Sequence, residues 1–364
     1  MSKLSTFGHD LYEGRVSFDF VGRRKLWYTI STIVMVLAIA GVFVRGFSFG
    51  IEFDGGVEFT AQVETNNSAT VEAMTQAVVD ADVPEAGDPI ATTSGDSAVR
   101  IQTAALSPDQ AATIEEALTK AGATEVSQNL VGPSWGEQVA KKALTGLIVF
   151  LILVVLFIWA YFREWRMSVA GIVALAHDLV ITAGVYAWSG FEVTPATVTG
   201  LLTILGYSLY DTVVVFDKVR ENTKGVLRSN SRTYVEQANL AVNQTLVRSI
   251  NTSITALLPV GALLFVGVFV LGTGPLKDLA LALFVGMAVG TYSSIFVATP
   301  IAAQLKSYEP AVKAHTAKVL ERRAKGPVVE TAHETRPSRP VITSGAAGRT
   351  QPKRTARSKR GKGR

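Results

Sequence analysis

Six apolar stretches, each long enough to cross a lipid bilayer, constrain the fold of this chain more than any other feature of its sequence. About 20 apolar residues in a helix span the roughly 30 Å hydrocarbon core of a membrane. The sequence predicts spanning helices at 26–45, 143–161, 167–188, 195–216, 249–271 and 276–304. The first apolar run continues past an A-x-A-like cleavage site and follows a long polar leader, which favours an uncleaved span over a signal peptide.

Charge is distributed unevenly along the chain. Residues 46–140 contain 2 Lys or Arg and 15 Asp or Glu, a balance of −13, whereas residues 306–364 contain 16 and 4, a balance of +12. Basic residues also gather before the first span and in the connections after the second and fourth spans. Basic loops stay on the cytosolic side of a membrane. We therefore expect both termini in the cytosol and residues 46–140 on the opposite, extracytoplasmic side of the membrane.

The expected organisation has five parts. They are a cytosolic N-terminal segment at 1–25, the first span at 26–45, an extracytoplasmic domain at 46–140, a five-helix remainder of the bundle at 141–304 with a cytosolic loop at 217–247, and a basic, disordered tail at 305–364. The tail is poor in large apolar residues, so it cannot bury a core. It is either an anchor to anionic lipid or the ribosome, or a solvated tail without a partner.

The outer domain has its own secondary-structure pattern. Strand and helix signals alternate in the order βαββαβ, with strands at 57–64, 88–93, 97–104 and 124–131 and helices at 68–81 and 107–122. This order is typical of a ferredoxin-like unit. Ser68 and Ser107 are the expected N-caps of the two helices, and Gly55–Gly56 predicts a tight turn into the first strand. In the loop at 217–247, Thr233 and Glu236 have capping-box spacing, which predicts a short interfacial helix.

Asp211 lies within the fourth predicted span, in its cytosolic half. A carboxylate in the middle of a spanning helix costs roughly 2.5–3.5 kcal/mol on insertion scales, so such residues usually have a function. It is either a protonatable group of an ion path or a structural partner of a nearby cation or hydroxyl. Arg248 begins the fifth span at similar depth. It either pairs with Asp211 or extends to the membrane surface as basic residues at span ends often do.

Further polar residues lie inside the spans. His177 and Asp178 lie midway along the third span, and the stretches "NTSIT" and "GTYSSIF" place hydroxyls and an amide in the fifth and sixth. These residues could form a hydrated path or simply let helices pack closely. The full set of pathway or packing candidates is His177, Asp178, Tyr207, Asn251, Thr252, Ser253, Tyr292 and Ser293.

Several classes of protein are excluded or disfavoured. The chain has no cysteine, so disulfides and thiolate metal sites are excluded, and four scattered histidines disfavour a metal cluster. We find no Walker motif, GxSxG, HExxH or zinc-ligand spacing. The sequence therefore predicts neither an enzyme nor a bound cofactor.

Six stretches resemble the SecF family of bacterial protein-export membrane proteins, and they occur in the family's order: "FGIEFDGG", "VGPSWG", "ALAHDLVITAG", "GYSLYDTVVVFDKVREN", "NQTLVRSINTSIT" and "GTYSSIFVATP". The resemblance covers about residues 20–305. Glu52 departs from it, because the family usually has Asp there. This weakens any specific role for that carboxylate.

The resemblance implies a six-span half bundle of the RND superfamily (a transporter superfamily), with a small α+β ferredoxin-like domain outside the membrane. It implies that the chain lies in the bacterial cytoplasmic membrane. Its partners would be a SecD-like paralogue, the SecYEG channel and, indirectly, SecA. The proton-motive force would assist export of unfolded preprotein after SecA has acted. The family's proton-pathway residues correspond to Asp211 and Arg248. Two alternatives remain: half of a proton-coupled small-molecule exporter, and a non-transporting assembly scaffold of the translocon.

Overall fold

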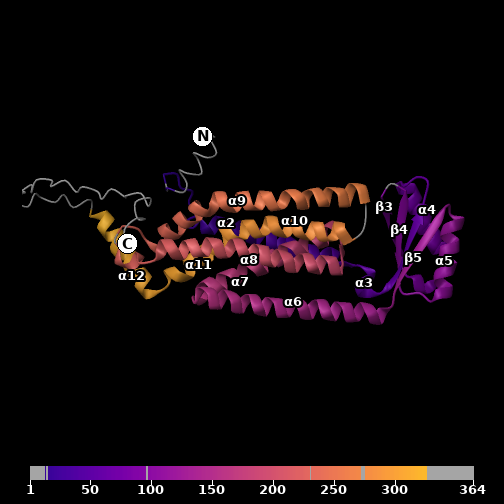
Figure 1. Ribbon diagram of the computed structural model, residues 1–364, viewed down its shortest axis with the longest axis horizontal. Coiled ribbons are helices and arrows are strands. Elements are labelled where there is room, and N and C mark those ends of the chain that lie inside the picture. Colours follow the sequence, from indigo (N-terminus) through magenta and orange to yellow (C-terminus); the bar gives the residue numbers. More distant parts are fainter. Residues whose placement is uncertain (1–12, 14, 96, 230, 272–274, 326–364) are drawn as a thin grey trace, which may run out of the picture. The chain divides into compact units, whose positions relative to one another are not determined.

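A bundle of long helices makes up most of the described chain (Figure 1). The computed structural model describes residue 13 and residues 15–95, 97–229, 231–271 and 275–325. Within these residues six helices are long and apolar enough to cross a membrane. They are Arg24–Arg45, Ser134–Phe162, Trp165–Ser189, Pro195–Arg228, Tyr234–Phe269 and Leu276–Ser307. The expected number of spans is confirmed.

The helices of the bundle have the following bounds: α2 Arg24–Arg45, α6 Pro133–Phe162, α7 Trp165–Ser189, α8 Pro195–Thr223, α9 Tyr234–Val266, α10 Pro275–Ser293 and α11 Thr299–Ser307. A 3-10 turn, η2, covers Val226–Arg228. Two π-helical segments interrupt the regular helices, η3 at Gly267–Leu271 and η4 at Ser294–Ala298. Segment η4 joins α10 to α11 inside the bundle.

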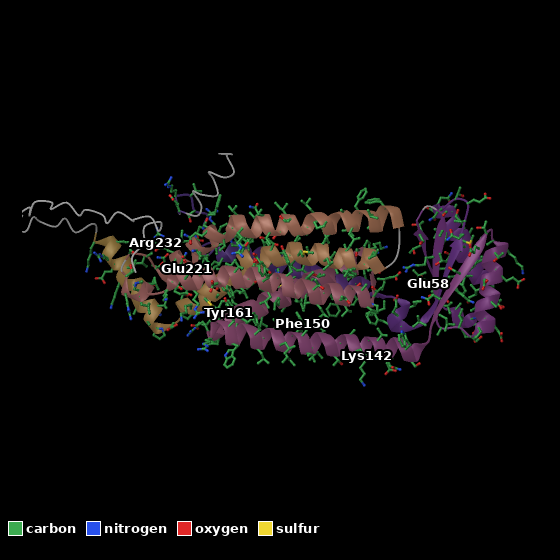
Figure 2. The ribbon with its side chains drawn as sticks, viewed as in Figure 1. Glu58, Lys142, Phe150, Tyr161, Glu221 and Arg232 are labelled. Carbon is green, nitrogen blue, oxygen red and sulfur yellow. The ribbon has the colours of Figure 1, made fainter. Side chains whose placement is uncertain are left out.

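Two ends of the bundle can be named from the connections between helices. The "loop side" carries the short α6–α7 turn and the α8–α9 connection, and Glu221 and Arg232 lie there (Figure 2). The "domain side" carries the end of α2 and the α7–α8 connection. These two segments are joined there by a parallel pair of short strands, β1 (Ser48–Phe49) and β6 (Glu192–Val193). Neither strand was expected from the sequence, because two residues carry no periodicity.

Close approach of helices depends on small residues where they cross. Helices α8 and α10 pack along their length, as do α2 and α7. A Cβ placed on Gly290 would lie 2.8 Å from the Ser208 Cβ, and one on Gly200 would lie 2.8 Å from the Ala282 Cβ. A Cβ on Gly184 of α7 would overlap Ala38 of α2. Each of these glycines therefore allows a backbone approach that alanine would prevent.

The residues between α2 and α6 form a sheet domain with the expected ferredoxin-like topology. Its elements are α3 Ile51–Asp54, β2 Gly56–Gln62, α4 Ser68–Asp80, the 3-10 turn η1 Pro84–Ala86, β3 Ile90–Ser94, β4 Ala98–Thr103, α5 Pro108–Lys120 and β5 Glu125–Val131. The strands are antiparallel in the order β3-β4-β2-β5. Strand β2 alternates, with Val57, Phe59 and Ala61 fully buried against α4 and α5. The alternation in sequence is thus the inward face of a central strand.

Of three local expectations in this domain, one is wrong, one is refined and one is confirmed. The N-cap of α4 is Asn67, which accepts a hydrogen bond from the Thr70 backbone NH, rather than Ser68. Gly55 and Gly56 do follow the entry segment, but they end the single helical turn α3. Ser107 caps α5 through a capping box with Gln110, as expected for its position.

The loop between the fourth and fifth spans is shorter than expected. The capping box of Thr233 and Glu236 is present, but it begins α9 itself, which continues into the fifth span without a break. The expected helix is therefore present and leads into the fifth span, but it is part of α9 rather than a short element of its own. Buried Ala238, Ala241 and Val242 pack on the bundle and let the helix extend beyond the membrane-crossing part.

The expected tail at 305–364 is also partly helical. Helix α12 covers Pro310–Ala324, with Val312, His315 and Val319 buried along one face. Their i, i+3 and i+7 spacing explains the difference, since it gives the basic segment an apolar stripe to bury. His315 Nε2 lies 2.5 Å from the Ser229 carbonyl oxygen. Residues 326–364, and with them most of the predicted tail, lie outside the described residues.

Candidate functional site

Asp211 is buried in the bundle and is held by hydroxyl groups from two other segments. Ser249 of α9 donates to Asp211 Oδ1 at 2.7 Å, and Ser294 at the start of η4 donates to Asp211 Oδ2. The Asp211 residue is 6% exposed. Among the described residues, no Lys or Arg forms an ion pair with it. A buried carboxylate with hydroxyl partners alone is an unusual and costly arrangement in a membrane.

Arg248 does not contact Asp211 in this structure. Its guanidinium Nη2 donates to the Tyr210 hydroxyl at 3.1 Å, and both side chains are exposed. The contacts Tyr210–Arg248 and Asp211–Ser249 are thus consecutive between the antiparallel helices α8 and α9. One residue in an α-helix corresponds to a rotation of about 100°. Ser249, and not Arg248, therefore lies beside Asp211 in this structure.

Asp178 of α7 is a second buried carboxylate. Its Oδ2 accepts hydrogen bonds from Ser208 of α8 at 2.6 Å and from Ser293 of α10 at 2.9 Å. Its Oδ1 lies 3.1 Å from Nδ1 of His177. His177 and Asp178 are 2% and 1% exposed. Although they are adjacent on the helix, their side chains turn toward each other and form one pair.

Two consecutive serines connect the two carboxylates. Ser293 is the last residue of α10 and donates to Asp178, and Ser294 is the first residue of η4 and donates to Asp211. A π-helical turn inserts an extra residue and is frequently found at functional sites. Here the change from α10 to η4 lets neighbouring hydroxyls reach acids on two different helices.

The other candidates lie around this centre in two groups. Ser253 joins the network, because its hydroxyl lies 2.6 Å from that of Thr291 and 3.5 Å from that of Tyr207. Tyr292 lies on the other side, with its ring stacked 6.0 Å from that of His177 and its hydroxyl 3.0 Å from Ser31 Oγ of α2.

Asn251 and Thr252 are not part of the network. Asn251 is exposed, Thr252 is half-buried, and neither side chain contacts either acid among the described residues. Asn251 instead lies one helical turn from Arg248 on the outward face of α9, which also carries exposed Ile254.

A cavity of about 360 Å³ lies on the loop side, between the ends of α8 and α9 and beside Tyr161 of α6. Asp217, Thr245 and Arg248 are among its lining residues. Thr245 lies one helical turn before Ser249 on α9. Asp211 and Ser249 are not among the residues that line the cavity.

An ion-pair cluster lies on the loop side of the bundle. Glu164, in the α6–α7 turn, accepts hydrogen bonds from Lys306 at 3.0 Å and from Arg166 at 2.8 Å. Burial alone would raise the pKa of Glu164, but the hydrogen bonds and positive charges of Lys306 and Arg166 outweigh it and lower the pKa. Glu164 therefore stays ionised and ties the turn to α11.

Three partners of the acids were not expected from the sequence: Ser208, Ser249 and Ser294. Each is a serine in an apolar span, and serine alone is most often a packing residue there. The spacing between a serine and an acid on the same helix does not predict a contact between them either. Ser208 and Asp211 both lie on α8, but Ser208 donates to Asp178 of α7. Among the described residues, no cluster of three or more His, Cys, Asp or Glu side chains could hold a metal ion.

Six candidate spans, a small sheet domain and two buried acids define a polytopic membrane protein. Two family profiles match the chain. The profile described as "Protein export membrane protein SecD/SecF, C-terminal" matches residues 112–308, and "SecD/SecF GG Motif" matches residues 40–66. The chain belongs to the SecD/SecF family, on its SecF branch.

Relatives in several bacteria support this assignment. Protein translocase subunit SecF of Streptomyces coelicolor is 52% identical over 329 residues, which cover 90% of this chain and 87% of that protein. The SecF subunit of Mycobacterium tuberculosis is 46% identical over 345 residues, covering 89% and 76%. These relatives are translocase subunits, and this chain is a SecF-like protein translocase subunit of the membrane.

A solved structure has the same fold. The crystal structure of SecDF, a translocon-associated membrane protein from Thermus thermophilus, matches with a TM-score of 0.70 at 35% identity. The match covers 80% of this chain but 39% of the SecDF chain. A SecDF structure in a super-membrane-facing form matches with a TM-score of 0.58 at 33% identity. This chain thus spans about two fifths of the length of the fused protein.

Proposed function

We propose that this chain couples proton movement across the cytoplasmic membrane to preprotein export, with Asp211 as the group that binds and releases the proton. The observation that carries the proposal is the environment of Asp211. It is buried in a span and held by the hydroxyls of Ser249 and Ser294, without a basic partner among the described residues.

Hydroxyl partners suit a group that changes its protonation state. A serine hydroxyl donates to the ionised carboxylate and can accept a hydrogen bond from the protonated one. A fixed Lys or Arg partner would instead favour the ionised form alone. With Ser249 and Ser294, both forms of Asp211 keep hydrogen bonds, so neither is trapped.

Arg248 supplies the switch in this proposal. When Asp211 is ionised, rotation of α9 by about 100° would exchange Ser249 for Arg248 beside the carboxylate. Protonation removes the charge and the reason for that rotation. Two arrangements of α9 that differ in their contacts with Asp211 meet the requirement that an ion shift a conformational equilibrium. A proton crossing the membrane potential supplies about 2.3 kcal/mol per 100 mV.

A second membrane subunit completes the site. The α8–α9 face carries Tyr210, Arg248 and Asn251, all exposed in the part of the chain that crosses the membrane. Exposed charge of this kind is costly against lipid. The fused SecDF relative carries a second half on the same chain. We infer that a SecD-type half covers this face, and that the pair works at the SecYEG channel after SecA has acted, on unfolded preprotein.

The proposal also includes an orientation. The loop side, with Arg163, Lys218, Arg220 and Arg232, faces the cytosol together with both termini, and the sheet domain faces outward. The cavity that Thr245 lines then opens to the cytosol, and it is the proposed release route for the proton. Segments beyond residue 325 would contact anionic lipid or the ribosome.

Preprotein export in sealed vesicles tests the proposed function. The vesicles would contain SecYEG and this chain with its SecD-type partner, with SecA and a proton gradient supplied. We expect the gradient to increase export with the wild-type chain and with Asp109→Asn, an exposed carboxylate of α5, but not with Asp211→Asn. An equal gradient effect in Asp211→Asn would show that Asp211 is structural and that the chain acts as a scaffold.

A further inference from the structure

We propose that His177 and Asp178 form a second proton-binding site, in which His177 Nε2 receives the proton and Asp178 holds it, and that Ser293 and Ser294 couple this site to Asp211. The proposal deepens the proposed function, on which the role of Asp211 rests. Of the groups involved, His177, Asp178 and Ser293 have no part in the proposed Asp211 mechanism.

The first observation is the unpartnered nitrogen of His177. Nδ1 of the ring lies 3.1 Å from Asp178 Oδ1, whereas Nε2 is buried and has no hydrogen-bond partner among the described residues. A buried nitrogen without a partner is energetically costly. With Nδ1 carrying the hydrogen that Asp178 accepts, Nε2 has a free lone pair. It can therefore accept a proton.

The pair can take up one proton without becoming charged at the imidazole. A proton that arrives at Nε2 forms an N–H bond there, and the proton on Nδ1 moves to Asp178 Oδ1. The ring returns to a neutral form with its hydrogen on Nε2, and Asp178 becomes a neutral carboxyl that donates to Nδ1. The only net change is one proton added and one negative charge removed. Nothing else is consumed.

The protonated form of Asp178 also keeps its hydrogen bonds. Its Oδ2 still accepts from Ser208 Oγ, 2.6 Å away. Ser293 has an alternative, because its hydroxyl also lies 3.2 Å from the Gly290 carbonyl oxygen of its own helix. When the negative charge disappears, Ser293 can turn from Asp178 to Gly290. The charge on Asp178 thus decides which of two acceptors the Ser293 hydroxyl uses.

The same choice exists one residue later. The Ser294 hydroxyl donates to Asp211 and also lies 3.1 Å from the Thr291 carbonyl oxygen. Ser293 and Ser294 share a peptide bond at the point where α10 changes to η4. A movement of this backbone that follows the release of Ser293 also moves Ser294. Protonation of Asp178 would therefore change the hydrogen bonding of Asp211.

The side chains that contact the pair from neighbouring helices are uncharged, which supports a single titrating unit. From the elements packed on Asp178, the contacts are the hydroxyls of Ser208 on α8 and Ser293 on α10. Tyr292 of α10 stacks on His177, and its hydroxyl lies 3.0 Å from Ser31 Oγ of α2. Among the described residues, no Lys or Arg forms an ion pair with Asp178. A proton is thus the available neutralising charge.

Infrared difference spectroscopy of the purified complex with the SecD-type partner tests the proposal without an export assay. The carbonyl stretch of protonated carboxyl groups would be followed over a pH titration. We expect one band to disappear in Asp178→Asn and to remain in Glu116→Gln, a variant of an exposed acid in the sheet domain. Loss of the His177 relay, in His177→Gln, should leave the band but shift its titration midpoint.

The coupling has its own readout. In Ser293→Ala we expect the Asp178 band to persist and the titration midpoint of the Asp211 band, identified by Asp211→Asn, to shift. If Asp178→Asn does not fold, Ser208→Ala, which keeps the carboxyl, should still move the Asp178 midpoint. A spectrum in which neither Asp178→Asn nor Ser208→Ala alters any band would overturn the second site. An unshifted Asp211 band in Ser293→Ala would overturn the coupling.

The two proposals fail independently. Gradient-driven export that persists in Asp211→Asn removes the proposed function, but it does not affect a proton band that belongs to Asp178. Conversely, an Asp178 that never protonates removes the second site and leaves the proposed role of Asp211 unaffected.

Discussion

Hydroxyl groups surround both acids inside the bundle, and their placement depends on glycine as much as on serine. Ser208, which donates to Asp178 of α7, also faces Gly290 of α10, where an added Cβ would lie 2.8 Å from the Ser208 Cβ. The contact between Gly290 and Ser208 therefore serves both helix packing and the hydrogen bonding of Asp178. A change that separates the helices also removes a hydrogen bond from a buried carboxylate.

Gly290→Ala tests this dependence. Overpacking of a tight contact typically costs about 1–3 kcal/mol, and loss of the Ser208 hydrogen bond adds to it. We expect a lower unfolding temperature of the purified chain in detergent. Gly146→Ala in α6, where an added Cβ would have no neighbour within 4 Å, should have no such effect. Equal unfolding temperatures for Gly290→Ala and wild type would contradict the close contact.

Among the elements, a short N-terminal strap, Phe18–Val21, is attached to α9 by two asparagines. Asn243 accepts from the Phe18 NH at 2.8 Å and donates to the Phe18 carbonyl at 2.9 Å. Asn239 accepts from the NH groups of Phe20 and Val21. The ring of Phe20 packs edge-on against Phe296 of η4, with centroids 5.5 Å apart. The strap thus supports the segment that presents Ser294 to Asp211.

Asn243→Ala removes both of its hydrogen bonds to Phe18, while the Phe18 carbonyl still accepts from Asn239. Each lost hydrogen bond contributes about 0.5–1.5 kcal/mol to stability. Hydrogen–deuterium exchange should become faster across the strap. Asn222→Ala, which removes a contact with Gln244 away from the strap, is the matched control. Unchanged exchange at Phe18–Val21 in Asn243→Ala would show that other contacts hold the strap.

The Glu164 cluster is a second connection between elements, and it depends on pH. Its lowered pKa means that the folded state favours the ionised form, so the stabilisation is complete above the ordinary value of 4.5 and is lost as pH falls through the lowered pKa. We expect Glu164→Gln to unfold at a lower temperature than wild type at pH 7, and the difference to shrink in acid below that range. A difference that grows on acidification would contradict this sign.

At the scale of the whole molecule, the distribution of charge predicts how the chain lies in the membrane. The sheet domain is acidic, and the loop side carries basic residues in both of its connections. Because the chain has no cysteine, single-cysteine variants can report each side without background.

Thiol labelling of intact cells tests the orientation. A membrane-impermeant reagent should label Lys120→Cys, at the exposed end of α5, and should label Arg232→Cys, between α8 and α9, only after permeabilisation. Figure 2 shows Arg232 on the loop side. Labelling of Arg232→Cys in intact cells would show that the orientation is the reverse, with the loop side and the cavity that Thr245 lines facing outward.

The sequence by itself determined the six spans and the ferredoxin-like order of the sheet domain, and it indicated Asp211 as a candidate functional residue. These features depend on local composition, on periods of 2 and 3.6 residues, and on the cost of placing a charge in hydrocarbon. It did not reveal the continuous α9 or the helical part of the tail, because both depend on apolar faces that find a surface to pack against.

Only the tertiary structure decided which groups hold the acids. The sequence left open whether Arg248 pairs with Asp211, and in the structure Ser249, the next residue of the same helix, lies beside the carboxylate instead. Ser208 lies three residues from Asp211 in sequence and yet binds Asp178 of another helix. The rotation of each helix about its axis determines such contacts. That rotation follows from close packing at glycines such as Gly290, which no single stretch of sequence specifies.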